Sequence, residues 1–291
     1  KNILVIGATG HQGRPVAEQL LAAGYTVRAM VRDPAKAADL AGMGIEVVQG
    51  DLDDQASLDA ATKGQDGVFM LLSFFFGNAT QAHNVVTAAK RAGVQQIVWN
   101  ATGPILPFDT GNPSIDFRRP VLAALEDSGI AFAALQPTVY MENFLIPAIA
   151  AKVAQQHVLA YPMPEVVTCQ WISHLDAAAY VVAAFRRGPV GNLTLNISGP
   201  EKLTGPEIAE RFGKALGRKI AFRPMPPQEF AKAVAFDGNE AAIVGYYSSV
   251  FDNPDMMNTD VDHQTALDAL PITPLSVEGW ARKYQAALTK A

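Results

Sequence analysis

The chain has 291 residues, of which 49% are hydrophobic and 18% charged, and its formal net charge at pH 7 is -5. This length suits about two domains, and the apolar fraction is large enough for a sizeable core. The acidic balance argues against a general nucleic-acid or membrane-surface binder, so we expect neither kind of partner.

The single cysteine, Cys169, has no second cysteine with which to pair, which is typical of a protein in a reducing cytoplasm. We see no charged leader before the first apolar segment and expect no signal peptide. The longest apolar run, residues 68–76, is too short to span a bilayer. We therefore expect a cytoplasmic protein that does not enter a membrane.

The first half of the chain alternates β-rich apolar runs with helical patterns. Strand–helix alternation gives right-handed crossovers and a parallel sheet covered on both faces, so it predicts a doubly wound α/β fold of the Rossmann type. The predicted strands cover residues 3–6, 26–31, 45–48, 67–72, 95–100 and 130–136. The predicted helices cover residues 13–23, 34–42, 55–62, 78–92 and 114–128.

The pattern changes after residue 150, where prolines become more frequent. Here Thr204 and Glu207 have the spacing of a capping box at the start of a helix. We expect a nucleotide-binding domain over residues 1–152, with a returning segment over about 166–200. Residues 201–291 are expected to form a smaller C-terminal α/β subdomain on the substrate side.

Three glycines follow the first predicted strand and precede the first predicted helix. Gly7, Gly10 and Gly13 stand three residues apart, and the order of strand, glycine turn and helix is typical of dinucleotide binding. Such a turn lets the backbone approach a pyrophosphate at a helix N-terminus. The residues between these glycines that are expected to contact phosphate are Thr9, His11 and Gln12.

The residue after the second strand distinguishes NAD from NADP. An acidic residue there binds the ribose 2′-hydroxyl, whereas an arginine pairs with a 2′-phosphate. The strand over residues 26–31 runs directly into Arg32, and Lys36 follows, so the sequence favours NADP(H) as the cofactor. Asp33 is the competing acidic residue, and we interpret it as the cap of a helix whose first residue is Pro34.

Other cofactor contacts are expected from residues that follow the later strands. Asp51 lies after the third strand, where its carboxylate would either accept from the adenine amino group or cap a helix, and both interpretations stay open. The further residues expected to contact the cofactor are Leu52, Leu72, Ser73, Asn100, Pro137 and Asn143.

Four segments of the chain together resemble one known family. They cover residues 7–13, 31–36, 50–54 and 137–144. They resemble the NmrA-like family of atypical short-chain dehydrogenases, and the similarity spans nearly the whole chain. The resemblance implies a Rossmann fold that binds NADP(H). It also implies a function among those of the family, which include NADP-sensing regulators and reductases of quinones and dyes.

The catalytic pair of standard short-chain dehydrogenases is missing here. Those enzymes use a tyrosine with a lysine four residues later. The lysine lowers the pKa of the tyrosine hydroxyl, so that it can transfer a proton. None of the 7 tyrosines has a lysine at that spacing. Several reductases of the family instead place a lysine where this chain has Arg118. Arginine does not shuttle protons near neutral pH, but it can hydrogen-bond a ribose or polarise a carbonyl. A solvated surface arginine is the alternative interpretation.

Thr102 and Tyr140 are the other candidate catalytic residues, because both follow strands. Thr102 lies where the family has a serine after the fifth strand, and its hydroxyl could donate a hydrogen bond near the nicotinamide. A substrate cleft lined by aromatic rings is expected from Phe74, Phe75, Phe76, Tyr140 and Phe144. Burial in the core is the alternative for the three consecutive phenylalanines. We see no cluster of metal ligands.

The leading hypothesis is an NADPH-dependent oxidoreductase that reduces a quinone-like, aromatic or other carbonyl substrate. The alternative is a non-catalytic NADP(H) sensor that acts through a protein partner, which the missing tyrosine–lysine pair favours. A third and weaker option is an epimerase or lyase that uses bound cofactor. The partner expected of the leading hypothesis is a small-molecule substrate, and whether the chain forms a homodimer stays open.

Overall fold

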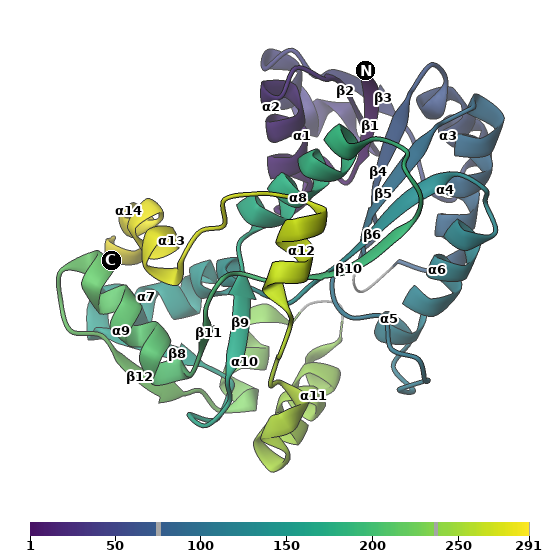
Figure 1. The fold of residues 1–291 in the computed structure, drawn as a ribbon. Coiled ribbons are helices and arrows are strands. Elements are labelled where there is room, and N and C mark those ends of the chain that lie inside the picture. The colour runs from purple at the N-terminus through teal and green to yellow at the C-terminus, as the bar shows by residue number, and fades with distance from the viewer. Residues whose placement is uncertain (74–76, 236–237, 291) are drawn as a thin grey trace. The chain divides into compact units, whose positions relative to one another are not determined.

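The computed structural model describes residues 1–73, 77–235 and 238–290. The chain divides into two compact units, and each of them is built from several segments of the sequence (Figure 1). The first unit contains Lys1–Thr138, His174–Ile197 and His263–Ile272. The second unit contains Val139–Ser173, Ser198–Asp262 and Thr273–Ala291.

A parallel sheet of seven strands forms the centre of the first unit, in the order β10-β6-β5-β4-β1-β2-β3. The strands are β1 (Asn2–Ile6), β2 (Thr26–Val31), β3 (Glu46–Gln49), β4 (Gly67–Leu71), β5 (Gln96–Asn100), β6 (Ala131–Pro137) and β10 (Leu193–Ile197). The direction of winding reverses between β1 and β4. Open α/β sheets bind ligands at the carboxyl ends of the strands beside such a reversal.

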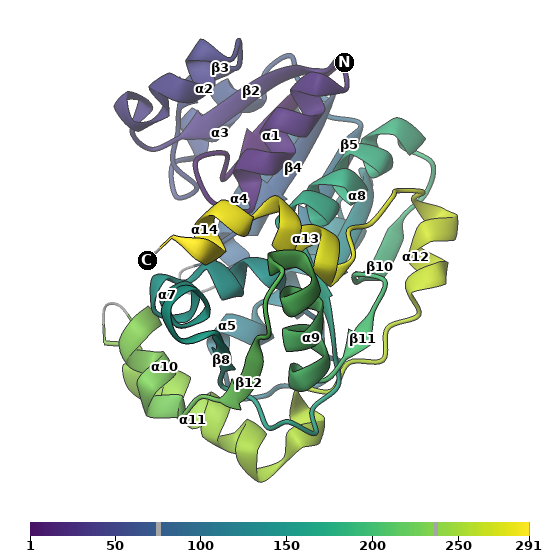
Figure 2. The same ribbon diagram turned by 90° about the vertical axis from the view of Figure 1, so that its left-hand side faces the viewer.

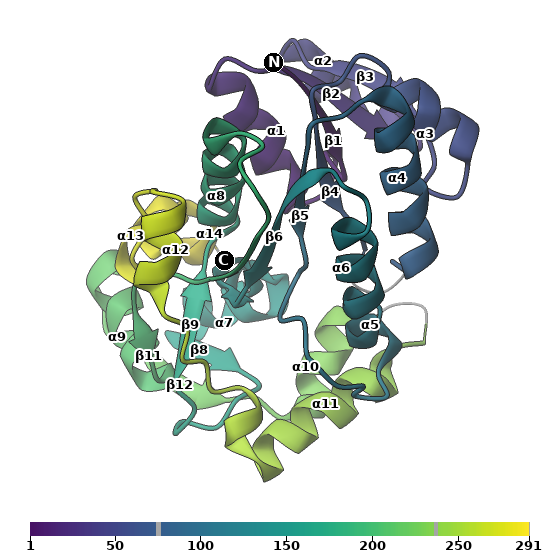
Figure 3. The ribbon, with the colours of Figure 1, turned by 45° about the vertical axis from the view of Figure 1, so that its right-hand side comes forward.

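Helices cover both faces of this sheet (Figures 2 and 3). α1 packs against α8 on one face, and α4 packs against α3 and α6 on the other. This arrangement confirms the predicted doubly wound α/β fold. The helices of the first unit are α1 (Gly13–Ala22), η1 (Pro34–Ala37), α2 (Ala38–Gly42), α3 (Gln55–Thr62), α4 (Ala79–Ala92), α5 (Pro113–Asp116), α6 (Arg118–Glu126), α8 (His174–Arg187) and α12 (His263–Ala269).

Coverage on both faces explains why the strands are continuous apolar runs. Every residue of β5 is buried, and Trp99 in this strand lies in the core between the sheet and α3, α4 and α6.

The helices that connect the strands end where the chain turns back towards the sheet. Gly93, for example, ends α4 with a φ of +73°, a conformation that glycine adopts without steric cost.

The second unit has a core of its own, built largely from aromatic rings. Phe144 lies at its centre, with ring centroids 4.4 Å from Trp171 and 5.4 Å from Phe212. The strands are β7 (Val139–Tyr140), β8 (Val158–Tyr161), β9 (Cys169–Ile172), β11 (Lys202–Leu203) and β12 (Ala221–Pro224). The helices are η2 (Met141–Leu145), α7 (Pro147–Gln156), α9 (Gly205–Leu216), α10 (Pro227–Val234), α11 (Glu240–Asp252), η3 (Pro254–Met256), α13 (Val277–Lys283) and α14 (Gln285–Thr289).

The first segment of the first unit ends at Thr138, whereas the sequence indicated a boundary at residue 152. The chain from residue 139 to 173 contributes Phe144 and Trp171 to the aromatic core of the second unit. Strand β9 pairs with β7 and β11 in that unit. These long-range packing contacts, which the local sequence does not reveal, determine the division.

The capping box of α9 has the geometry that its spacing predicts. The Glu207 carboxylate accepts from the Thr204 backbone N–H at 2.7 Å, and the Thr204 hydroxyl accepts from the Glu207 N–H at 3.4 Å.

Thr204→Ala removes a hydrogen bond at the helix start and should lower the free energy of unfolding by about 1 kcal/mol. Chemical denaturation measures this change. Thr204→Ser keeps the hydroxyl and should remain close to the parent, so an equal loss in both variants would contradict the capping role.

Candidate functional site

The glycine turn lies at the carboxyl end of β1, where it leads into α1. Gly7 has a φ of +85°, and its carbonyl accepts from the Gly10 N–H at 3.0 Å. A Cβ atom added to Gly13 would lie 2.2 Å from the Gly7 carbonyl oxygen, so only glycine fits there. Thr9, Gly10 and His11 are exposed. Helix α1 therefore begins immediately after an exposed turn of backbone.

The first turn of α1 has no side chain that caps it. Gln12 occupies the N-cap position without a side-chain cap hydrogen bond, and the first turn contains no acidic residue. Free N–H groups and the helix dipole favour an anion at such an end. The open first turn and the exposed backbone together are suited to a phosphate group.

Arg32 follows β2 at the same edge of the sheet, and its side chain is exposed. Within the residues that the structure describes, its guanidinium has no hydrogen-bond or ion-pair partner. Asp33 instead uses a carboxylate oxygen to accept from the Ala35 N–H at 3.1 Å, which confirms that it caps η1. The Lys36 Nζ lies 3.8 Å from the Asp33 Oδ2, so the positive charge of Lys36 is partly compensated. Arg32 is thus the cation most available to a ligand here.

Asp51 stabilises the turn that follows β3. Its carboxylate accepts from the Asp53 N–H at 2.9 Å, and its own N–H donates to the Ser57 hydroxyl at 2.9 Å. The cap of α3 is Asp54, which accepts from the Ala56 N–H at 3.0 Å. Asp51 is therefore a turn residue rather than a helix cap, and it remains exposed beside the partly buried Leu52.

Asn100, at the end of β5, joins two of the predicted regions. Its side-chain amide donates to the Gln12 side chain at 3.4 Å, and its oxygen accepts from the Thr102 N–H at 2.8 Å. The sequence placed both Asn100 and Gln12 at the cofactor, and the fold brings them into contact. Leu72 and Pro137 are buried near the ends of β4 and β6, whereas Ser73 is exposed.

Arg118 is neither solvated nor aimed outward. It is 2% exposed, and its guanidinium donates to the carbonyl oxygens of Pro104 at 3.0 Å and Thr102 at 3.4 Å. The alternative interpretation, a solvated surface arginine, is therefore wrong, because the loop between β5 and α5 folds over the side chain. Thr102 has a φ of +57°, and its hydroxyl donates to the Ala101 carbonyl at 2.7 Å.

The second unit carries the remaining described candidates. Asn143 donates to the Tyr161 hydroxyl at 3.0 Å, and Tyr140 is partly buried. Phe144 is fully buried, so it offers no surface to a substrate in this structure. An aromatic residue that follows a strand can be either exposed or buried. The ring of Phe144 is buried because it packs against Trp171. Phe74, Phe75 and Phe76 lie outside the described residues.

No motif in the sequence singles out His174, the first residue of α8. Burial, and to a smaller extent the nearby His11 of the glycine turn, lowers the pKa of His174 to about 4. A neutral imidazole therefore lies close to the candidate phosphate site at pH 7. Only the packing of α8 against α1 reveals this proximity.

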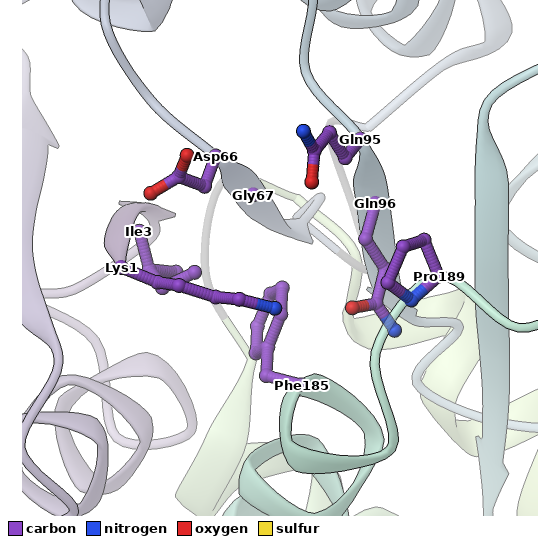
Figure 4. Close-up of a pocket in the computed structure, with 8 residues that line it drawn as sticks. All are labelled: Lys1, Ile3, Asp66, Gly67, Gln95, Gln96, Phe185 and Pro189. Carbon is purple, nitrogen blue, oxygen red and sulfur yellow. The ribbon is translucent and has the colours of Figure 1, made fainter.

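A small pocket lies at the opposite, amino edge of the sheet (Figure 4). Ile3, Gly67 and Gln96 line it from β1, β4 and β5, and Lys1, Asp66 and Phe185 also line it. Because ligands of such folds bind at the carboxyl ends of strands, it does not belong to the candidate site.

The described part of the chain offers neither a metal centre nor a membrane span. In residues 1–73, 77–235 and 238–290, no group of three or more His, Cys, Asp or Glu side chains is arranged to hold a metal ion. In the same ranges, the helices are all too short or too polar to cross a membrane.

Comparison with known proteins finds a matching family and similar relatives for this chain. The model of the NmrA-like family matches residues 1–281. The chain is 31% identical to an NAD(P)H azoreductase of Xenophilus azovorans over 76% of each protein. It is 32% identical to quinone oxidoreductase 2 of Escherichia coli over 80% of each protein.

A solved structure extends the likeness to the fold. It is an NADPH-dependent quinone oxidoreductase of Escherichia coli complexed with NADPH, 26% identical, with a TM-score of 0.76. The alignment covers 97% of this chain and 99% of that one. The likeness therefore covers both units of this chain.

The partly buried His174 predicts a specific dependence of stability on pH. Its folded pKa lies below the usual value, so the unfolded chain binds the proton first as the pH falls. Stability should be full above about pH 6.5 and decrease as the pH falls towards 4, by on the order of 1–3 kcal/mol from this group. His174→Gln should flatten this part of the curve.

Denaturant unfolding between neutral and acidic pH measures the effect. The exposed His83 on α4 provides the control, and His83→Gln should leave the curve unchanged. If His174→Gln and the parent lose stability in parallel over this range, His174 does not carry the effect.

Proposed function

The chain belongs to the NmrA-like family, and we propose that it is an NADPH-dependent reductase of a quinone-like, aromatic or other carbonyl substrate. The observation that carries the proposal is an uncapped helix N-terminus at the same sheet edge as an exposed arginine, Arg32, which has no partner among the described residues. Two relatives that match about three quarters or more of the chain are named for reduction with NAD(P)H or for quinone reduction, which supports the proposed chemistry.

The residues of the first unit fit NADP(H). The close contact between Gly13 and Gly7 leaves room for a pyrophosphate against backbone N–H groups. Arg32 supplies a planar cation for the 2′-phosphate, with Lys36 as a second positive charge. Asp33 is engaged with the Ala35 N–H, so it is not free to favour a ribose 2′-hydroxyl.

Reduction of a carbonyl requires a hydride at carbon and a proton at oxygen. The bound cofactor supplies the hydride. The chain supplies binding and orientation, through the glycine turn, Arg32 and Asn100. Water or a weak donor such as Tyr140 or Thr102 provides the proton, because no tyrosine is followed by the lysine that would lower its pKa. Catalysis in this account depends mainly on position.

The sensor alternative has the same cofactor site but needs a protein partner. The two relatives named for reduction favour the reductase over the sensor. Affinity separates the two functions experimentally. A sensor must bind NADP and NADPH with different affinities and change its association with a partner, whereas a reductase must consume NADPH with an acceptor.

Arg32→Ala tests the cofactor assignment. Loss of a charge-assisted hydrogen bond to the 2′-phosphate should weaken NADPH on the order of 10- to 100-fold and leave NADH almost unchanged. Titration of the purified protein with each nucleotide measures both dissociation constants. Arg91→Ala is the control, because Arg91 is exposed on α4 and pairs with Asp59 at 2.8 Å. Equal losses for NADPH and NADH would refute the role of Arg32.

The reductase itself is tested by incubating the protein with NADPH and a panel of quinones, azo dyes and aromatic ketones. We expect the absorbance of the reduced nicotinamide to fall with at least one class of acceptor and the reduced acceptor to appear in equal amount. NADH should support a slower reaction at the same concentration. Tight NADPH binding without turnover across the panel would reject the reductase and leave the sensor.

A further inference from the structure

The turn that follows β5 is held in a backbone conformation that its sequence disfavours. Thr102 has a φ of +57°, in the left-handed region that β-branched residues rarely adopt. Gly103 follows with a φ of +148°. Strain of this kind persists only where surrounding contacts impose it, and it is concentrated at functional sites. The contacts that impose it here can be identified.

Arg118 makes two of these contacts. One terminal nitrogen donates to the Pro104 carbonyl at 3.0 Å, and the other donates to the Thr102 carbonyl at 3.4 Å. A Cβ atom on Gly103 would lie 3.1 Å from both terminal nitrogens and 3.2 Å from Cζ. The Gly103 backbone therefore lies directly against the guanidinium, and three consecutive residues surround it.

Both ends of the turn are fixed by side chains from neighbouring strands. Asn100 at the end of β5 accepts from the Thr102 N–H at 2.8 Å. Gln136 in β6 accepts from the Ile105 N–H at 2.6 Å. Asn100 also contacts Gln12 of the glycine turn. The conformation of this turn is thus linked by hydrogen bonds to the candidate cofactor site.

The position of Arg118 is unfavourable by itself. A buried cation loses its hydration, and its place at the first residue of α6 opposes the helix dipole. The planar guanidinium compensates by donating in two directions to separate carbonyl groups. A lysine ammonium offers a single point of charge and cannot reproduce this planar fork.

We propose that Arg118 is a positioning residue that holds the strained Thr102–Pro104 turn and thereby fixes Thr102 and Asn100 for the nicotinamide end of the cofactor. The inference rests on the proposed function. Arg118 is not the proton donor in this account, because its terminal nitrogens are bonded to backbone and arginine stays protonated near neutral pH. Its effect on catalysis passes through the turn.

The first experiment compares Arg118→Met with Arg119→Met. Arg119 is the adjacent residue, exposed and paired with Asp109, so its variant is the matched control. Arg118→Met should lower kcat on the order of 10- to 100-fold, because small displacements of positioning groups have effects of this size. The KM for NADPH should change much less, because Arg32 and the glycine turn are intact. Arg118→Lys should recover only part of kcat.

A second readout does not depend on activity. Amide hydrogen exchange should accelerate at Thr102 and Ile105 in Arg118→Met, both with and without NADPH, and should be unchanged in Arg119→Met. Unchanged exchange and unchanged kcat in Arg118→Met would overturn the proposal. If the parent protein does not oxidise NADPH at all, the proposed function fails, whereas exchange still tests whether Arg118 holds the turn.

Glycine substitutions provide a route if Arg118→Met does not fold. Gly103→Ala places a methyl group against the guanidinium. Gly111, in the same connection, also has a positive φ (+79°, against +148° at Gly103), but a Cβ atom there would meet no atom within 4 Å. We expect faster exchange at Ile105 and lower kcat in Gly103→Ala only. Equal effects in both variants would mean that backbone strain alone, and not the contact with Arg118, controls the turn.

Discussion

The close approach of Gly13 to the carbonyl oxygen of Gly7 is the constraint on which the rest of the site depends. A Cβ atom at residue 13 would lie 2.2 Å from that oxygen, so the backbone itself forms the contact between β1 and α1. The contact fixes the amino end of α1 at the carboxyl edge of the sheet. Arg32 reaches this edge from β2, and Asn100 reaches it from β5 through Gln12.

Two arginines in the first unit, Arg32 and Arg118, have different roles because one is exposed and the other is buried. Arg32 is exposed and has no partner among the described residues, so it retains its hydration until a ligand phosphate replaces water. Arg118 is buried, and its donors are directed to backbone carbonyls. A buried cation must be satisfied by its own protein, which makes it suitable for fixing a loop. An exposed one is suitable for recognition.

The sequence was most informative where local chemistry decides the structure. The strand–helix alternation, the glycine turn, the Asp33 cap and the Thr204 capping box each depend on neighbouring residues, and the structure contains all of them. The burial of Arg118 depends on a loop that returns over it from β5, and no spacing in the sequence encodes that contact. The left-handed Thr102 is equally hidden, because threonine by itself argues against such a conformation. Phe144 is buried by rings from distant segments.

The account depends finally on whether hydride leaves the cofactor on this protein. The most direct measurement is a single turnover with a quinone and NADPH carrying deuterium at the transferable position of nicotinamide C4. The account predicts that nicotinamide absorbance falls, that the fall is slower with deuterium, and that the label is lost from the cofactor. Binding of NADPH with no loss of absorbance, or a loss that is insensitive to deuterium and leaves the label in place, would contradict it.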